Sequence, residues 1–265
     1  MSPPVENIAG YTVGTQSVSA CIADLVLWIK QAPPGAPCRW LACLNPHSYA
    51  VALDDPPFAQ ALHAANWLIP DGAGIVLASK LLGGQIRERV TGSDIFREVQ
   101  VELNHLGGYR VFFLGSTEET LAAIRQRLAQ DYPNLQIAGA YSPPFKAEFS
   151  AADNQAMIAA INAAAPDVLW VGMTAPKQEK WLHQHHAQLS VPFAAAVGAV
   201  FDFYTGRVKR SHPVFQRLGL EWLPRLLQEP RRLWRRMGVS APIFLGHVLR
   251  QRLKVKGERL KAKET

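Results

Sequence analysis

The chain is organised around Leu68-Ile69-Pro70-Asp71-Gly72-Ala73-Gly74-Ile75-Val76. An apolar lead-in, a Pro-Asp-Gly-x-Gly turn and a second apolar segment predict a strand, a rigid turn and a helix over 73–82. Pro70 fixes its own φ, and the glycines allow backbone angles or close approaches that a Cβ would obstruct. Asp71 is the one carboxylate on this turn. It either caps the helix, whose positive dipole end favours the ionised form, or serves as a functional group.

Apolar strands alternate with amphipathic helices on both sides of this turn. We expect strands over 8–13, 39–44, 67–70, 109–114, 136–141, 167–171 and 193–197. We expect further helices over 17–30, 48–65 with a break at Pro56-Pro57, 94–106, 118–130, 151–164 and 180–189. This alternation predicts an α/β fold, with a Rossmann-like parallel sheet covered by helices on both faces.

Several polar or glycine positions each fall just after an expected strand: Asn45, Asp71, Gly115, Gln178 and Asp202. Because the carboxyl ends of parallel strands meet at one edge of a sheet, we expect these five residues to share that edge and form a site. Each also has a plain structural alternative. Gln178 is equally well placed to begin a helix, and Asp202 to cap a turn.

Composition limits the cell compartment and the function class. The 265 residues suit one large α/β domain, or one domain with an appendage. Three cysteines without a Cys-x-x-Cys pair favour a reducing cytosol over a disulfide scaffold or a zinc site. The chain shows no signal peptide and no apolar run near the ~20 residues that span a bilayer. We therefore expect a soluble or peripheral protein.

Positive charge is concentrated at the C-terminal end. The 16 Lys and Arg and four Glu of residues 207–265 give a net charge of +12, whereas residues 1–206 carry −5. We therefore divide the chain into a catalytic α/β domain, 1–206, and a basic helical appendage, 207–265. Bulky apolar residues interleave with Arg in the appendage, as in helices that lie in a membrane interface. A helical cap packed on the body is the alternative, and a nucleic-acid-binding surface is another.

Several familiar chemistries are excluded by pattern. The chain has no Gly-x-Ser-x-Gly elbow, no P-loop and no Gly-x-Gly-x-x-Gly after the first strand. No Asp-x-Asp pair would hold a divalent ion, and we interpret His183, His185 and His186 as part of a solvated helix. A diphosphate leaving group can instead be stabilised by arginine and helix N-termini, with Arg87 and Arg89 as candidates or as solvated loop charges.

Ordered blocks over about residues 8–236 resemble the WecG/TagA/CpsF glycosyltransferase family. The Pro-Lys-Gln-Glu block and the Glu-Arg-Val-x-Gly-x-Asp run are the most specific of them. The blocks are Asn45, Pro70-Asp71-Gly72-Ala73-Gly74, Glu88-Arg89-Val90-Thr91-Gly92-Ser93-Asp94, Phe113-Leu114-Gly115, Val171-Gly172-Met173-Thr174-Ala175-Pro176-Lys177-Gln178-Glu179, Val197-Gly198-Ala199-Val200-Phe201-Asp202 and Leu220-Glu221-Trp222.

The resemblance implies an inverting transfer of a sugar from a UDP-sugar to a polyprenyl-diphosphate-linked sugar, without metal or cofactor. The protein would lie on the cytoplasmic face of the bacterial plasma membrane. Asp71 stands where the family has its proposed general base, and Arg89 where it has an arginine near the diphosphate. Substrate-binding positions are expected at Cys43, Asn45, Gly72, Gly115, Gln178 and Asp202, with appendage arginines Arg225, Arg232 and Arg235 closing over the diphosphate.

Cys43 departs from the family pattern, in which many relatives have Thr. The hydroxyl contact is lost or replaced there, so the donor is either UDP-N-acetylmannosamine or UDP-glucose. UDP-glucose is the donor implied by a resemblance to xanthan-type enzymes of exopolysaccharide biosynthesis. The other hypotheses are a non-catalytic nucleotide-sugar-binding protein and a nucleic-acid-binding protein that uses the basic tail. Exposed apolar residues in the tail also favour a homo-oligomer in the absence of membrane.

Overall fold

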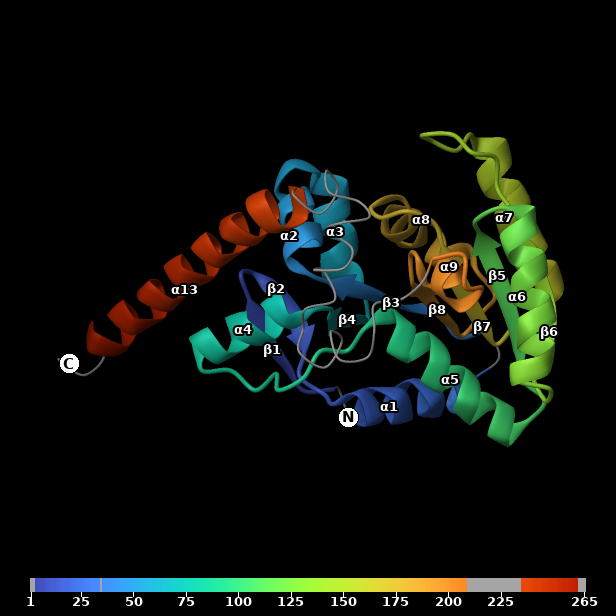
Figure 1. The fold of residues 1–265 in the computed structure, drawn as a ribbon, viewed down its shortest axis with the longest axis horizontal. Helices are drawn as coiled ribbons and strands as arrows, with labels where there is room; N and C mark the ends of the chain where they lie inside the picture. Colours follow the sequence, from blue (N-terminus) through green and yellow to red (C-terminus); the bar gives the residue numbers. More distant parts are fainter. Residues whose placement is uncertain (1–2, 34, 209–234, 262–265) are drawn as a thin grey trace.

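The computed structural model describes residues 3–33, 35–208 and 235–261. One parallel sheet of six strands, in the order β4-β3-β8-β7-β5-β6, forms its centre (Figure 1). The strands are β3 (Arg39–Leu44), β4 (Trp67–Pro70), β5 (Arg110–Gly115), β6 (Gln136–Tyr141), β7 (Val168–Gly172) and β8 (Phe193–Ala196). The expected α/β fold with a parallel sheet is confirmed.

The helices lie close to their expected places. They are α1 (Val18–Gln31), α2 (Pro46–Asp54), α3 (Pro56–Ala64), α4 (Ala73–Leu82), α5 (Gly92–Leu106), α6 (Glu118–Asp131), α7 (Ala151–Ala164), α8 (Lys177–His185), η1 (His186–Gln188), α9 (Val200–Tyr204), η2 (Arg235–Ser240) and α13 (Ala241–Lys261). The helix expected over 48–65 is two helices, because Asp55 caps a new one whose first turn contains both prolines.

Three boundaries differ from the prediction in ways that concern the site. α8 begins at Lys177 instead of residue 180, so Gln178 lies inside a helix. Asp202 lies within α9 and not directly after a strand. The single strand expected over 8–13 is a separate antiparallel hairpin of β1 (Val5–Ile8) and β2 (Tyr11–Gly14).

Side-chain caps in the sequence fix where the helices begin. Asn45 caps α2, and Thr91 caps α5 in a box with Asp94. In such a box each side chain satisfies a backbone N–H that the first helical turn leaves without a partner. Ser17 and Thr117 cap α1 and α6 in a simpler way. These four helices therefore begin where a capping side chain stands in the sequence.

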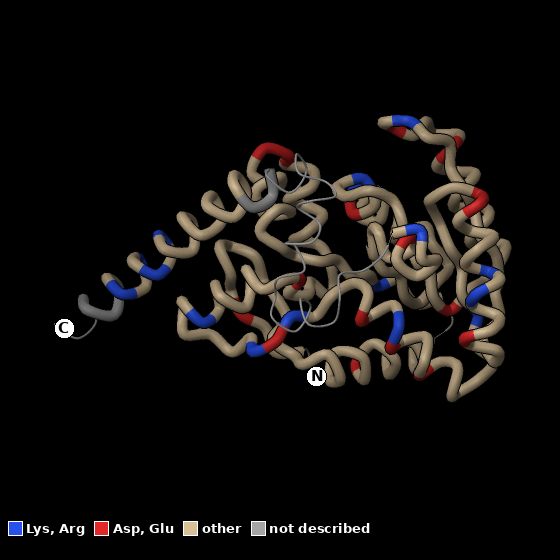
Figure 2. The backbone as a smooth tube through the Cα atoms, viewed as in Figure 1, with Lys and Arg blue, Asp and Glu red and all other residues tan. Residues whose placement is uncertain are grey.

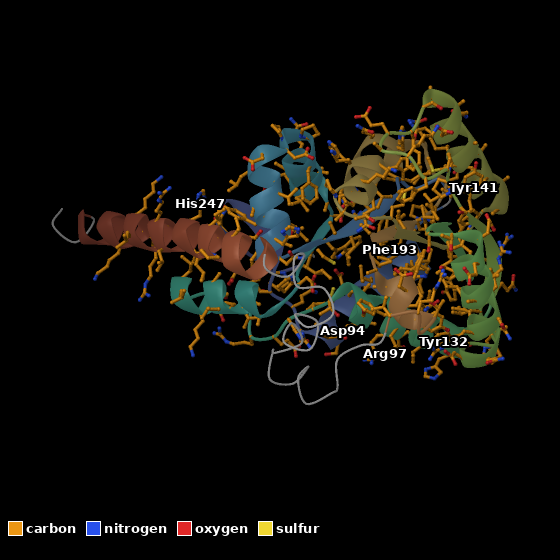
Figure 3. All side chains as sticks on the ribbon, turned by 45° about the horizontal axis from the view of Figure 1, so that its top comes forward. Asp94, Arg97, Tyr132, Tyr141, Phe193 and His247 are labelled. Atoms are coloured by element: carbon orange, nitrogen blue, oxygen red, sulfur yellow. The ribbon has the colours of Figure 1, made fainter. Side chains whose placement is uncertain are left out.

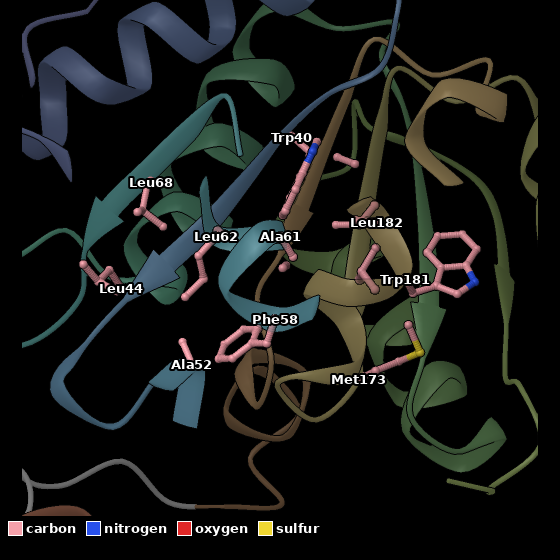
Figure 4. Close-up of a cluster of buried hydrophobic side chains, with 14 of the residues drawn as sticks. Trp40, Leu44, Ala52, Phe58, Ala61, Leu62, Leu68, Met173, Trp181 and Leu182 are labelled. Carbon is pink, nitrogen blue, oxygen red and sulfur yellow. The ribbon is translucent and has the colours of Figure 1, made fainter. Parts of the chain in front are cut away.

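Two apolar layers cover the two faces of the sheet. α2, α3, α7 and α8 pack on one face, and α1, α5, α6 and α9 pack on the other. Residues alternate between the layers along a strand, so Trp40 and Leu44 of β3 face one cluster and Leu41 faces the other. Figure 4 shows the α3 side chains Phe58 and Leu62 in the first cluster. Both faces being buried explains why the strands are almost wholly apolar.

The C-terminal helix α13 is partly seated on this body. Phe244 and Val248 are fully buried, and the Gln251 side chain bonds to the backbone of Asn7 and Ala9 in the hairpin turn. The remainder of α13 extends away from the body (Figure 1). Within the described ranges, no helix is both long enough and apolar enough to cross a bilayer.

Candidate active site

Asp71 lies at the carboxyl end of the edge strand β4. Its backbone N–H donates to the Leu44 carbonyl at 2.8 Å, which continues the pairing of β4 with β3 past Pro70. Asn45, the first residue after β3, donates from Nδ2 to the Asp71 Oδ2 at 3.2 Å. The side chains that follow two neighbouring strands therefore meet, as expected for the carboxyl edge of a parallel sheet.

Asp71 does not cap the helix that follows it. The N-cap of α4 is Gly72, at φ +98°, and no side chain caps this helix. Nothing would obstruct a Cβ at Gly72, so its backbone angle alone requires glycine. At Gly74 the reason is space, because a Cβ would lie 2.4 Å from Cγ of Pro46. The starts of α2 and α4 are thus packed together, and the capping interpretation of Asp71 is wrong.

Hydrogen bonds to both the oxygen and the nitrogen fix the orientation of the Asn45 side-chain amide. Its Oδ1 accepts hydrogen bonds from the backbone N–H groups of His47 and Ser48 at 3.0 and 2.9 Å. The oxygen is therefore committed to the α2 N-terminus, and the nitrogen must face Asp71. Asn45 accordingly holds the Asp71 carboxylate in one orientation.

Arg89 lies beside the same turn. The backbone N–H of its neighbour Val90 donates to the Pro70 carbonyl at 2.9 Å, which ties the α4–α5 segment to the end of β4. Arg89 is half-buried, whereas Arg87 is exposed and bonds to the Gly84 carbonyl of its own loop. Of the two predicted diphosphate-binding arginines, Arg89 is therefore the one whose backbone neighbour is bonded to the end of β4, one residue before Asp71.

Gln178 and Glu179 form a buried polar cluster in the first turn of α8, each only 3% exposed. The Gln178 Oε1 accepts from the Gly198 N–H at 3.0 Å, and its Nε2 donates to the Glu179 Oε1 at 2.9 Å. Burial raises the pKa of Glu179 to about 7, although the hydrogen bond from Gln178 opposes that rise. Glu179 was not among the predicted site residues, although it ends the Pro-Lys-Gln-Glu block that carries the family resemblance.

Cys43 connects this cluster to Asp71. Burial raises the pKa of its thiol well above the usual range, and the charges of Asp71 and Glu179 raise it further. The Gly92 N–H bonds to the sulfur, and a Cβ at Gly92 would lie 3.5 Å from Sγ. Cys43 therefore stays a neutral thiol between the two carboxyl groups. Asp71 and the α8 cluster share one edge of the sheet.

The remaining predicted residues are described by their own elements, and not by a contact with Asp71 or Gln178. Gly115 ends β5 at φ +114°, where a Cβ would lie 2.6 Å from the Gly172 carbonyl of β7, so its small size serves strand packing. Asp202 lies in α9, and its carbonyl accepts from the Val208 N–H. Arg235 is in η2, while Arg225 and Arg232 lie outside the described residues.

The pattern described as the "Glycosyl transferase WecG/TagA/CpsF family" matches residues 6–258. The chain belongs to this family. The chain is similar to proteins named N-acetylglucosaminyldiphosphoundecaprenol N-acetyl-beta-D-mannosaminyltransferase. The protein of that name from Bacillus spizizenii is 33% identical over 80% of this chain and 79% of its own. Those from Bacillus subtilis and Staphylococcus aureus are 30% and 28% identical over similar shares.

Membership of the WecG/TagA/CpsF family makes the chain a glycosyltransferase, as expected from its motif blocks. The family match extends past the sheet and through most of α13, so the C-terminal helix is part of what the family shares. Among the residues that the structure describes, no three His, Cys, Asp or Glu side chains are grouped as metal ligands would be.

Proposed function

We propose that this chain transfers N-acetylmannosamine from UDP-N-acetylmannosamine to a polyprenyl-diphosphate-linked N-acetylglucosamine during cell-surface polysaccharide synthesis. The transfer inverts the anomeric centre and needs no metal, and Asp71 is the general base. The observation that carries the proposal is the Asp71 carboxylate, which does not cap α4 and is oriented by Asn45 at the carboxyl edge of the sheet.

A single oriented carboxylate suits a single displacement. Asp71 would take the proton from the acceptor hydroxyl while that oxygen attacks the anomeric carbon of the donor. An inverting reaction needs no second carboxylate as nucleophile. The relatives are named for a β-linked product, which an α-linked nucleotide sugar would give by inversion.

The leaving diphosphate would meet positive charge from the protein itself. α4 and α8 begin at this edge of the sheet, and no side chain caps either of them. Their first backbone N–H groups and dipoles are suited to an anion, and Arg89 adds a full positive charge beside the turn. Donors fixed where charge develops are a large source of rate enhancement, so these groups support transfer without a metal ion.

UDP-glucose is the second candidate donor because of Cys43. A neutral thiol lies beside Asp71 at the position where the resembled family has a hydroxyl. A pocket that loses a hydroxyl contact loses part of its discrimination between sugars that differ in polar groups. The relatives' names favour N-acetylmannosamine, and Cys43 is the feature that favours a change.

We further propose that α13 brings the enzyme to the inner face of the membrane, where a lipid-linked acceptor lies. Figure 2 shows Lys and Arg spaced along the outer part of α13. Arg250, Arg252, Lys254 and Lys256 are exposed there, together with Leu249 and Leu253. Basic side chains beside exposed leucines are suited to an anionic lipid surface.

The test is a donor panel with a synthetic polyprenyl-diphosphate N-acetylglucosamine acceptor and a chelator present. UDP release should be fastest with UDP-N-acetylmannosamine, should require the acceptor, and should not change on chelation. Faster UDP release from UDP-glucose would show that UDP-glucose is the donor and would leave the proposed mechanism unchanged. Acceptor-independent release, or none with any UDP-sugar, would contradict the proposed function.

A further inference from the structure

Glu179 is a second acid at the site, and the transfer mechanism does not use it. The side chain is buried beneath the carboxyl edge, where its Oε1 accepts from Gln178. Its Oε2 is buried and has no hydrogen-bond partner among the described residues. A buried carboxyl oxygen without a donor is costly when the group is ionised, and far less so when that oxygen carries a proton.

The groups around Glu179 supply no compensating positive charge. β3 contributes the neutral thiol of Cys43, and the end of β4 contributes the negative Asp71. α3 packs against α8, but its cap Asp55 is paired with Lys180 at 2.8 Å. β8 is wholly apolar, and Gly198, two residues past its end, bonds to Gln178. No ion pair to Glu179 is found within the described ranges, so an added anion would meet an acid that is not neutralised.

We propose that Glu179 takes up a proton from solvent when the anionic nucleotide-sugar donor enters the site, so that donor binding is linked to proton uptake. The inference rests on the proposed function, because it requires a UDP-sugar at this edge. The step is a protonation only: the Glu179 carboxylate and one proton become the carboxylic acid, and no other bond changes.

Electrostatics decides which group takes the proton. The diphosphate of a UDP-sugar carries two negative charges, which favour the neutral form of any acid nearby. Asp71 must remain ionised to act as a base, and Cys43 already carries its proton. Burial raises the pKa of Glu179 to about 7 against the hydrogen bonds that lower it, so a modest further rise on binding changes its protonation at physiological pH. Two carboxyl groups thus have opposite tasks, set by their surroundings.

Protonation would leave the Gln178 amide in place. The Glu179 Oε1 can continue to accept from Gln178 while the proton sits on Oε2. Gln178 also remains bonded to Gly198, which leaves one N–H and one lone pair of its amide for a ligand. The charge of the cluster therefore changes without a change in the group that faces the donor.

Calorimetry of the full chain tests this linkage. UDP-N-acetylmannosamine is titrated at pH 7.5 in buffers of different ionisation enthalpy, so that the protons taken up can be counted. The nucleotide sugar is used in place of free UDP, because the terminal phosphate of free UDP itself titrates near pH 6. We expect uptake of roughly half to three-quarters of a proton per donor bound, because a group with a pKa of about 7 is already partly protonated at pH 7.5, and a Kd that weakens up to about tenfold per pH unit above 7. Glu179→Gln should abolish the uptake and flatten the Kd, whereas the exposed control Glu102→Gln should change neither.

Infrared difference spectra of the wild-type chain give a readout independent of any variant. Donor binding should produce a protonated carboxyl band and remove a carboxylate band. Donor binding without proton uptake, or uptake that persists in Glu179→Gln, would overturn this inference and leave the proposed function standing. Failure of every UDP-sugar to bind would instead overturn the proposed function, and the inference with it.

Discussion

Asp71 shows how little of the site depends on one residue alone. β4 sets the position of Asp71, and Asn45 sets the orientation of its carboxylate. Gly72, at positive φ, takes the N-cap position of α4 in place of Asp71. The Asp71 carboxylate does not cap α4, and its Oδ2 accepts a hydrogen bond from Asn45 instead. The chemistry therefore depends on three neighbours whose contributions can be separated by substitution.

Asp71→Asn should remove the base and keep the shape. We expect UDP-sugar binding within a few-fold of wild type and a turnover lower by ~100-fold or more, because general-base help is lost. Steady-state kinetics with the lipid-linked acceptor, beside calorimetry of the donor, measures both. The exposed Asp54→Asn serves as the control, and wild-type turnover in Asp71→Asn would exclude the assignment.

Asn45 has two tasks that different substitutions separate. Ser is as good an N-cap as Asn, so Asn45→Ser should keep the stability of α2 and lose only the contact with Asp71. We expect kcat to fall on the order of tenfold, by loss of orientation. Asn45→Ala should also lower the free energy of unfolding by about 1 kcal/mol. Equal kcat in Asn45→Ser and wild type would show that this contact is dispensable.

Glu179 should also make folding stability depend on pH. Its pKa is raised from 4.5 to about 7, so the folded state binds this proton more tightly than the unfolded state does. The resulting stability is present below pH 4.5 and is lost as pH rises through 7, by on the order of 3 kcal/mol. Urea unfolding should therefore find Glu179→Gln similar to wild type at pH 5 and more stable at pH 8. The opposite order at pH 8 would contradict a buried carboxylate.

At the scale of elements, α13 is seated on the two helices that begin at the site. α2 starts directly after Asn45, and α4 starts after Asp71 and Gly72. The Tyr49 hydroxyl of α2 lies 2.6 Å from Nδ1 of His247 on α13, a residue labelled in Figure 3. The body-facing side of α13 thus contacts the elements that position the carboxylate and its amide partner.

Phe244→Ala should weaken the packing of α13 on α2. Phe244 is fully buried against Tyr49, with ring centroids 5.2 Å apart, so its truncation should cost about 3–5 kcal/mol. Hydrogen exchange should speed up across α13 and the start of α2 while the central strands stay protected. Leu253→Ala, at a side chain that is 69% exposed, is the matched control. Unchanged exchange in Phe244→Ala would mean that α13 is held elsewhere.

At the scale of the whole molecule, charge separates the body from the C-terminal end. Replacing Arg250, Arg252, Lys254 and Lys256 with Gln should weaken binding to anionic vesicles by about 4 kcal/mol, since each contributes ~1 kcal/mol near such a surface. Vesicle flotation at low and high salt measures this, because salt screens the attraction. Exposed Arg97 and Arg125, changed to Gln together, should have no such effect. Equal loss in both variants would reject a role specific to α13.

The sequence pattern predicted whether each element is a helix or a strand better than it predicted which strands lie side by side. Alternation indicated a parallel sheet, but not that β8 lies between β3 and β7, because periodicity carries no information about which strands pair. The hairpin was missed because its turn, Ala9-Gly10, has positive φ at both residues without the usual Asn-Gly signal. Glu179 was quoted in a specific sequence block but not predicted as a site residue, because burial, and not residue type, makes it unusual.

In the described part of the chain, β8 is the last strand to be synthesised, yet it lies in the middle of the sheet. Until residues 193–196 leave the ribosome, β4-β3 and β7-β5-β6 are separate half-sheets with open edges. Open strand edges recruit other strands, so a nascent chain is exposed to aggregation until this late insertion joins the halves. A translation product that stops before Phe193 would therefore be two unjoined fragments of a sheet, and not a smaller enzyme.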